Sequence, residues 1–283
     1  QRRPLEIAVQ HPGKMDAVAN APPCAGSGGG STRPAGFTFE QDAAISSGDL
    51  PAADQFGAAL TGMNYTVRSN DDIITISNGS ALEGTSLVLD SQYASYILDP
   101  LSLSTLDVTG DAYLAADITT TGTQRYRNAS WIVNDRTLTA TTVTFDDMVN
   151  SGGFFAEGVA YEDAALVIQG DMIDHGAIGN GQRLKSLHVT GTSFLDGTLV
   201  YTAGDQRFDG EVTIGDDQFM VSDGGGLIRF GSTVDGAHSL TVQTSEDGLI
   251  SFNGDIGSRT PLVDIFLSTD DGIGGRSIPD RAT

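Results

Sequence analysis

The chain has 283 residues, of which 36 are glycine, and its formal net charge is −22 at pH 7. Such an acidic surface repels phosphate backbones and anionic lipids, which argues against nucleic acid and bilayer binding. Because Cys24 is the only cysteine, an internal disulfide and a cysteine zinc site are both excluded. Few lysines and abundant Gly, Ser, Thr and Asp favour β-strands joined by tight turns. No apolar run is long enough for a membrane-spanning helix.

Residues 1–36 differ in composition from the rest of the chain. They hold five prolines and a Gly/Ser run, so they bury too little apolar surface to fold alone. Within them, Leu5, Ile7 and Val9 alternate in the pattern of one short strand. We predict a flexible N-terminal arm with a Gly/Ser linker, whose strand adds to the sheet of its own domain or of a neighbouring molecule.

Residues 37–63 form a transition or cap segment. Phe37–Phe39 has the pattern of a strand, and residues 50–60 have the pattern of a short helix that begins near Pro51. The chain starts with Gln and has no apolar leader, which is consistent with a mature or excised form of a longer precursor.

Residues 64–283 show short apolar alternations separated by turns of Gly, Asp, Asn and Ser. Each alternation predicts a short strand with one buried face, and the spacing suits a sandwich, a barrel or a solenoid. In the last third of the chain the apolar pairs are Val212/Ile214, Phe219/Val221, Ile228/Phe230, Leu240/Val242, Ile250/Phe252 and Ile265/Leu267.

An internal repeat of about 80 residues selects the solenoid among these folds. Leu103–Gly110 matches Leu184–Gly191, and both match Leu262–Thr269. In the same phase, Gly122–Tyr126 matches Gly204–Phe208. A unit of this length fits about four coils of roughly 20 residues, in which like residues stack over like residues.

Two details follow from such a stack. The apolar phase slips by one residue between Leu184 and Leu187, which predicts a corner of the coil. Tyr126 and Phe208 are expected at related positions along the core. We therefore predict an all-β fold, a parallel β-helix with an extended N-terminal arm.

The repeat style resembles that of large bacterial surface proteins, the filamentous-haemagglutinin-like and autotransporter-type adhesins. The segments that carry the resemblance are Leu103–Gly110, Ile118–Tyr126 and Thr137–Phe145, and it extends over about residues 64–270. It implies a right-handed parallel β-helix, export to the cell surface or the medium, and a role in adhesion, aggregation or matrix building. Chains of that family are usually longer, and the first 60 residues match no part of them.

No motif for catalysis or for a cofactor is present. The four histidines lack metal-binding spacing, and phosphate-loop, dinucleotide and serine-hydrolase motifs are missing. We expect no enzyme; a polysaccharide-active β-helix would need a cluster of acids on one face. The candidate acids for such a cluster are Asp146/Asp147, Asp171/Asp174, Asp216/Asp217 and Asp270/Asp271.

Paired aspartates near glycine could also bind calcium, as at Asp216/Asp217 and at Asp270/Asp271, which precede Gly272. Aspartate also favours tight turns without any metal, and Asp135 and Asp217 fall at equivalent turn positions of the repeat. We expect turn aspartates and no required cofactor.

The sequence predicts a secreted structural protein, the subunit of an extracellular filament, sheath or adhesive layer. Its partner would be a second copy, joined head to tail through end-to-end stacking and exchange of the strand of Leu5, Ile7 and Val9. The alternative is a monomeric adhesin segment that binds a glycan, a host receptor or another surface protein. That alternative needs exposed aromatic side chains on one face, for which the candidates are Tyr93, Tyr96, Trp131 and Tyr161.

Overall fold

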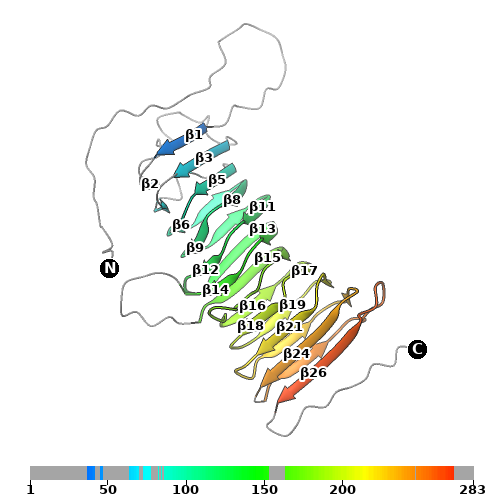
Figure 1. Cartoon of the computed structure of the whole chain (residues 1–283). Helices are drawn as coiled ribbons and strands as arrows, with labels where there is room; N and C mark the ends of the chain where they lie inside the picture. Colours follow the sequence, from blue (N-terminus) through cyan, green and yellow to red (C-terminus); the bar gives the residue numbers. More distant parts are fainter. Residues whose placement is uncertain are drawn as a thin grey trace, which may run out of the picture.

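The computed structural model describes residues 37–41, 45–46, 64–69, 73–77, 82, 84, 86–152, 163–245 and 247–270. Over these ranges the chain forms 26 β-strands and no α-helix, and neighbouring strands pair in parallel. They wind into a β-helix with β1 near one end and β26 at the other (Figure 1). The predicted all-β parallel β-helix is confirmed. The predicted arm and the helix expected at residues 50–60 lie outside the described residues.

The strands stack into three faces, because a coil places strands on successive faces and turns between them. Face 1 contains β7 (Leu101–Leu103), β10 (Ile118–Thr120), the first halves of β13 (Arg136–Phe145) and β15 (Ala165–Asp174), β16 (Ser186–Val189), β19 (Gln206–Phe208), β22 (Leu227–Phe230) and β25 (Leu249–Phe252). Face 2 contains β1 (Phe37–Gln41), β3 (Asn64–Ser69), β5 (Ser86–Ser91), β8 (Thr105–Val108), β11 (Thr123–Tyr126), the second halves of β13 and β15, β17 (Ser193–Leu195), β20 (Val212–Ile214) and β23 (Val234–Asp235).

Face 3 contains β2 (Ile45–Ser46), β4 (Ile74–Ile76), β6 (Ala94–Ile97), β9 (Asp111–Leu114), β12 (Ser130–Ile132), β14 (Val149–Ser151), β18 (Leu199–Thr202), β21 (Gln218–Ser222), β24 (Ser239–Ser245) and β26 (Asp264–Asp270). Single bridges from Ile178 to Val149 and Val200 connect its two parts. Strands β13 and β15 turn from face 1 into face 2, so those two faces form one 16-stranded sheet.

Alternating burial along each strand decides which side chains form the core. In β8, Leu106 and Val108 are buried whereas Thr105 and Asp107 point outward. Because consecutive coils are in register, buried residues form columns parallel to the axis. Hydrogen bonds between side chains and neighbouring coils commonly join residues 20 to 22 positions apart, which is the length of an ordinary coil.

Aromatic rings stack inside two of these columns. The rings of Tyr126 and Phe145 lie 5.3 Å apart on face 2. On face 1, Phe208 stacks on Phe230 at 5.8 Å, and Phe230 on Phe252 at 4.6 Å. All except Phe252 are fully buried. Tyr126 and Phe208 thus take the same kind of core position on two different faces.

The matched sequence segments are displaced by one face from one copy to the next. The predicted corner is confirmed, since Leu184 bridges Thr202 on face 3 and Leu187 is paired on face 1. The equivalent strand of the first copy, β8, lies on face 2, and that of the third, β26, on face 3. An offset of four whole coils would have kept all copies on one face, so the observed offset is one face short of four coils.

Candidate functional site

Aspartates at the turns accept hydrogen bonds from the backbone of the next coil. The expected turn role of Asp135 and Asp217 is confirmed: Asp135 Oδ1 accepts from Ala165 N at 3.0 Å, and Asp217 Oδ1 from Ser239 N at 2.8 Å. These backbone donors hold the pKa of both carboxyls below the usual value. The same arrangement recurs at Asp117, Asp171, Asp205 and Asp235. These six aspartates therefore have a structural role, because corner N–H groups need acceptors.

Basic side chains in the described part of the chain are mostly engaged by carboxylates of the same coil or of a nearby one. The pairs are Arg68–Asp90, Arg125–Asp146, Arg127–Asp107, Arg183 with Asp163 and Asp223, Lys185–Asp135, Arg207–Asp205, Arg229–Asp209 and Arg259–Glu211. The described surface consequently presents no group of free cations that would attract a phosphate backbone or an acidic sugar.

Three histidines lie beside acids of a neighbouring coil. His175 Nδ1 is 3.0 Å from Asp196 Oδ2, and His188 Nε2 is 2.8 Å from Asp209 Oδ2. His238 lies near Asp216 and Asp217, and one ligand atom of each falls within 4.8 Å of the others. This grouping was not visible in the sequence, because it joins two coils.

The cluster of Asp216, Asp217 and His238 is only partly available for a metal. Asp216 Oδ1 accepts from Asp217 N at 2.7 Å, while Asp217 Oδ1 is used by Ser239 N. Both aspartates are exposed to solvent. The side chains of the other calcium candidate, Asp270/Asp271, lie outside the described part of the structure.

The remaining candidate acids do not meet in a single cluster. Asp146 pairs with Arg125, and Asp147 Oδ1 accepts from the N–H of Met148. Asp171 points outward from face 2, whereas Asp174 points into the core. The paired acids of the sequence thus lie in different environments.

Asp174 occupies a core column between two apolar side chains. In the register of face 2 it stacks between Phe145 and Leu195, and it is fully buried. Neither carboxylate oxygen has a well-formed hydrogen bond among the described residues. The nearby backbone N–H of Gly176 lowers the pKa of Asp174, but this effect is weaker than that of burial. Burial raises the pKa of Asp174 well above its ordinary value, so the neutral acid is the favoured form.

Outward-facing aromatic rings form a column on face 3. The ring centroids of Tyr96 and Tyr113 are 4.5 Å apart, and those of Tyr113 and Trp131 are 6.1 Å apart, with nearly parallel planes. Tyr96 and Trp131 were sequence candidates, but Tyr113 was not. The rings cover one another's faces and leave mainly edges toward solvent, so the column stabilises coil stacking more than it offers open rings to a ligand.

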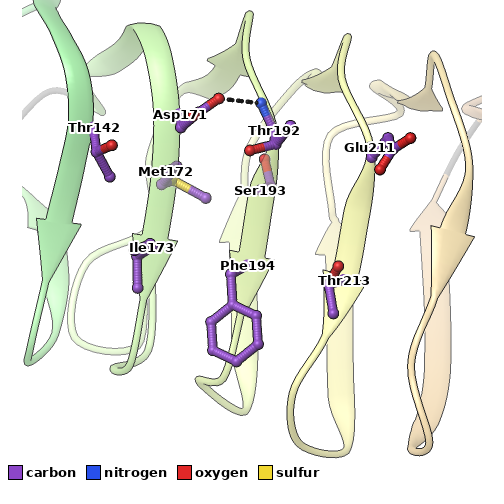
Figure 2. A pocket seen from close by; sticks show the side chains of 9 residues that line it. All are labelled: Thr142, Asp171, Met172, Ile173, Thr192, Ser193, Phe194, Glu211 and Thr213. Carbon is purple, nitrogen blue, oxygen red and sulfur yellow. Dashed lines mark hydrogen bonds between the residues drawn. The ribbon is translucent and has the colours of Figure 1, made fainter.

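A hollow of about 310 Å³ lies on the outer surface of face 2 (Figure 2). It extends over four consecutive strands, β13, β15, β17 and β20. Its lining contains Thr142, Asp171, Met172, Ile173, Thr192, Ser193, Phe194, Glu211 and Thr213. Of these, only Asp171 was a sequence candidate. The lining comes from four strands that are well separated along the chain, so no local motif marks it.

Among the described residues, no further coil covers the core beyond the one that contains β25 and β26. Seven large apolar side chains are exposed among the described residues, and four of them belong to this coil: Leu249 (60%), Ile256 (37%), Val263 (72%) and Phe266 (42%). The inward residues of the same coil are only partly buried, namely Ile250, Phe252, Ile265 and Leu267. We call these eight residues the C-terminal end surface. Figure 1 shows β26, the last strand of this coil, at the end of the β-helix opposite β1.

Several predicted residues are not placed by the structure. Leu5, Ile7 and Val9, proposed for self-assembly, lie outside the described residues, as does Tyr161. Tyr93 is described and is 58% exposed, at the turn before β6. The described ranges contain no helix with the length and hydropathy of a membrane span.

Comparison of the chain with protein-family models, with curated proteins and with solved structures finds no match.

Proposed function

We propose that this β-helix is a secreted structural subunit that assembles end to end into an extracellular filament, sheath or adhesive layer. The observation that carries the proposal is the C-terminal end surface. The proposed role involves no catalytic step, and its principal partner is a second copy of the chain.

The C-terminal end surface has the properties of an unfinished core. Phe252 stacks on the fully buried Phe230, yet Phe252 itself is only partly buried because no further coil covers it among the described residues. Leu267 likewise follows the fully buried Val242 in its column. Another coil would bury both side chains, and burial of apolar area is the main favourable contribution to association.

The backbone at both ends supports a head-to-tail contact. Strands β25 and β26 each have a strand partner on one side only, within the described part of the chain. At the other end, β1 and β2 likewise pair on one side only. A free parallel edge favours the addition of a further strand. Because the two ends belong to the same three-faced coil, the start of one copy can continue the end of another, which gives an open linear polymer.

The N-terminal arm supplies a second contact in this proposal. Residues 1–36 carry four basic and two acidic residues, in a chain whose net charge is −22. The arm is thus attracted to the acidic body of a neighbouring copy. In the assembly, the strand of Leu5, Ile7 and Val9 pairs with a free edge of that copy.

The test is the association state of the full chain, followed by sedimentation velocity and electron microscopy over a range of concentrations. We expect filaments or sheets with an axial repeat on the order of 50 Å, the length of about ten stacked coils. The double substitution Ile256→Lys/Val263→Lys places charges on exposed positions of the C-terminal end surface and should prevent assembly.

Leu98→Lys is the matched control, because Leu98 is 40% exposed but lies far from the last coil. Deletion of residues 1–36 should weaken assembly without unfolding the β-helix. A full chain that stays monomeric at the highest attainable concentration would contradict the proposal, as would filaments that persist in the double lysine variant.

A further inference from the structure

We propose that the hollow on face 2 binds a neutral, hydroxyl-rich saccharide, with Phe194 as its stacking platform. This binding site is independent of end-to-end assembly, because it lies on the side of the β-helix. It is also the site that the alternative predicted from the sequence, a monomeric adhesin segment, would use for a glycan.

The register of four strands builds the hollow from two parallel rows of side chains. In Figure 2 one row crosses β13, β15, β17 and β20, and the other crosses β15, β17 and β20. One row contains Thr142, Asp171, Thr192 and Glu211, and the other contains Ile173, Phe194 and Thr213. With strands about 4.8 Å apart, the four strands span roughly 14 Å. An extended ligand would therefore lie along the axis, across the strands.

The ring of Phe194 is held in place before any ligand arrives. His175 packs edge-on against it, with ring centroids 6.1 Å apart and planes at 68°. His175 is fixed in turn by Asp196 at 3.0 Å. A Cβ atom on Gly215 would come within 2.7 Å of the Phe194 ring, so the ring lies over a glycine that leaves room for it. A rigid, partly exposed ring offers apolar surface at low entropic cost on binding.

The polar groups around this ring are free to serve a ligand. Among the described residues, the hydroxyls of Thr142, Thr192 and Thr213 have no hydrogen-bond partner, and each can both donate and accept. Asp171 Oδ1 accepts from Thr192 N at 2.7 Å, which orients the carboxylate and leaves Oδ2 as an acceptor. Sugar hydroxyls need both donors and acceptors beside an apolar surface, and this hollow offers them together.

Charge and spacing exclude two other ligand classes. Glu211 is neutralised by a bidentate pair with Arg259 at 2.7 and 2.8 Å. Asp171 and Glu211 are two strands apart, about 10 Å, whereas one calcium ion needs its oxygens within about 2.6 Å of itself. Asp171 would repel a uronate or a phosphate. The ligand class that fits the hollow is therefore a neutral saccharide.

The test measures binding of three neutral hexasaccharides, cellohexaose, maltohexaose and laminarihexaose, to the full chain by calorimetry and saturation-transfer NMR. We expect at least one of them to bind. Phe194→Ala should weaken that binding roughly tenfold, through loss of the ring contact. Thr213→Val, which keeps the shape of the side chain, should weaken it several-fold through loss of one hydroxyl.

The matched control is Phe219→Ala, because Phe219 is 40% exposed on face 3, away from the hollow. Thermal melting of each variant shows whether the β-helix is intact. The proposal is overturned if none of the three sugars binds, or if Phe194→Ala binds as tightly as the unmodified chain. It is equally overturned if hexalysine binds in a Phe194-dependent manner while the sugars do not, since the hollow would then be a site for basic peptides.

Discussion

Gln124 and Gln206 make the same hydrogen bonds at two different corners of the β-helix. Each side-chain Nε2 donates to a carbonyl six residues earlier in the chain and to another 15 residues later, on the next coil. The acceptors are Ile118 O and Thr139 O for the first glutamine, and Val200 O and Val221 O for the second. The sequence repeat thus encodes one type of corner, and this type occurs at two different positions around the coil.

Replacement of Gln206 by leucine should destabilise the fold. The substitution keeps the approximate volume but removes the donor that serves Val200 O and Val221 O at 3.2 and 2.7 Å. Buried carbonyls left without a donor cost about 1–3 kcal/mol. Urea titration followed by circular dichroism measures this loss. Gln243→Leu is the control, because Gln243 points outward from β24, and it should change stability by less than about 0.5 kcal/mol. Equal losses in both variants would show that the corner hydrogen bonds contribute little.

The fold could be predicted because alternation and repeats report local structure. The slip between Leu184 and Leu187 correctly marked a corner, since each leucine stays buried while the chain changes face. The face of each strand could not be predicted, because it depends on the summed lengths of all preceding turns. The irregular register between Thr139 and Thr142 and the extra residues between β14 and β15 both alter that sum.

The same dependence explains which site residues were missed. Tyr113 lies one coil after Tyr96 and one coil before Trp131, so the coil length of the structure identifies a column that the sequence pattern did not. Phe194 and Thr213 approach Asp171 only through the register of β15, β17 and β20. Asp174 looked like a partner of Asp171, but strand alternation turns their side chains to opposite sides of the sheet.

Asp174→Asn should stabilise the protein at neutral pH. Burial raises the pKa of Asp174 in the fold, so the fold favours the protonated acid. Its contribution to stability is complete below the unfolded-state pKa and is lost as pH rises toward the folded-state pKa. Asparagine is neutral throughout and avoids that loss, so the variant should be the more stable of the two proteins at pH 7.

Urea titrations of both proteins from pH 4 to pH 8 measure the effect of Asp174. The difference between them should shrink toward pH 4. Asp209→Asn is the control, because Asp209 is partly exposed, is paired with His188 and does not act on Asp174. If Asp174→Asn is less stable than the unmodified chain across the whole range, the carboxylate has a partner that stabilises its charged form.

Asp135→Asn should reduce the loss of stability in acid. The N–H of Ala165 and the ammonium of Lys185 lower the pKa of Asp135 in the fold. The stability it contributes is present above the unfolded-state pKa and is lost as pH falls through the folded-state pKa. Asparagine can still accept from Ala165 but does not titrate. At neutral pH the variant should lose only about 0.5 kcal/mol, since the Lys185 pair is exposed.

Stability measured from pH 6 down to pH 2 checks the prediction for Asp135. The curve of Asp135→Asn should be flatter than that of the unmodified chain below about pH 4. Asp264→Asn is a suitable control, because the Asp264 carboxylate accepts from the N–H of its own neighbour, Ile265, and from no other described residue. Identical acid curves for Asp135→Asn and the unmodified chain would mean that the hydrogen bond to Ala165 does not couple to protonation.

Phe230→Ala should mainly destabilise the monomer, whereas Phe252→Ala should mainly weaken assembly. Phe230 is fully buried between Phe208 and Phe252, so its truncation should cost the monomer about 3–5 kcal/mol. Phe252 is only partly buried in one chain, and its truncation should cost the monomer less. In a head-to-tail polymer the ring of Phe252 is covered by the next copy, so Phe252→Ala should raise the concentration needed for assembly.

Urea titration measures the loss of monomer stability, and sedimentation velocity measures the concentration needed for assembly. Phe219→Ala, on the side of the β-helix, should leave assembly unchanged. Unaltered assembly of a folded Phe252→Ala variant would show that polymers do not form through the C-terminal end surface, because no contact made there could leave that ring uncovered.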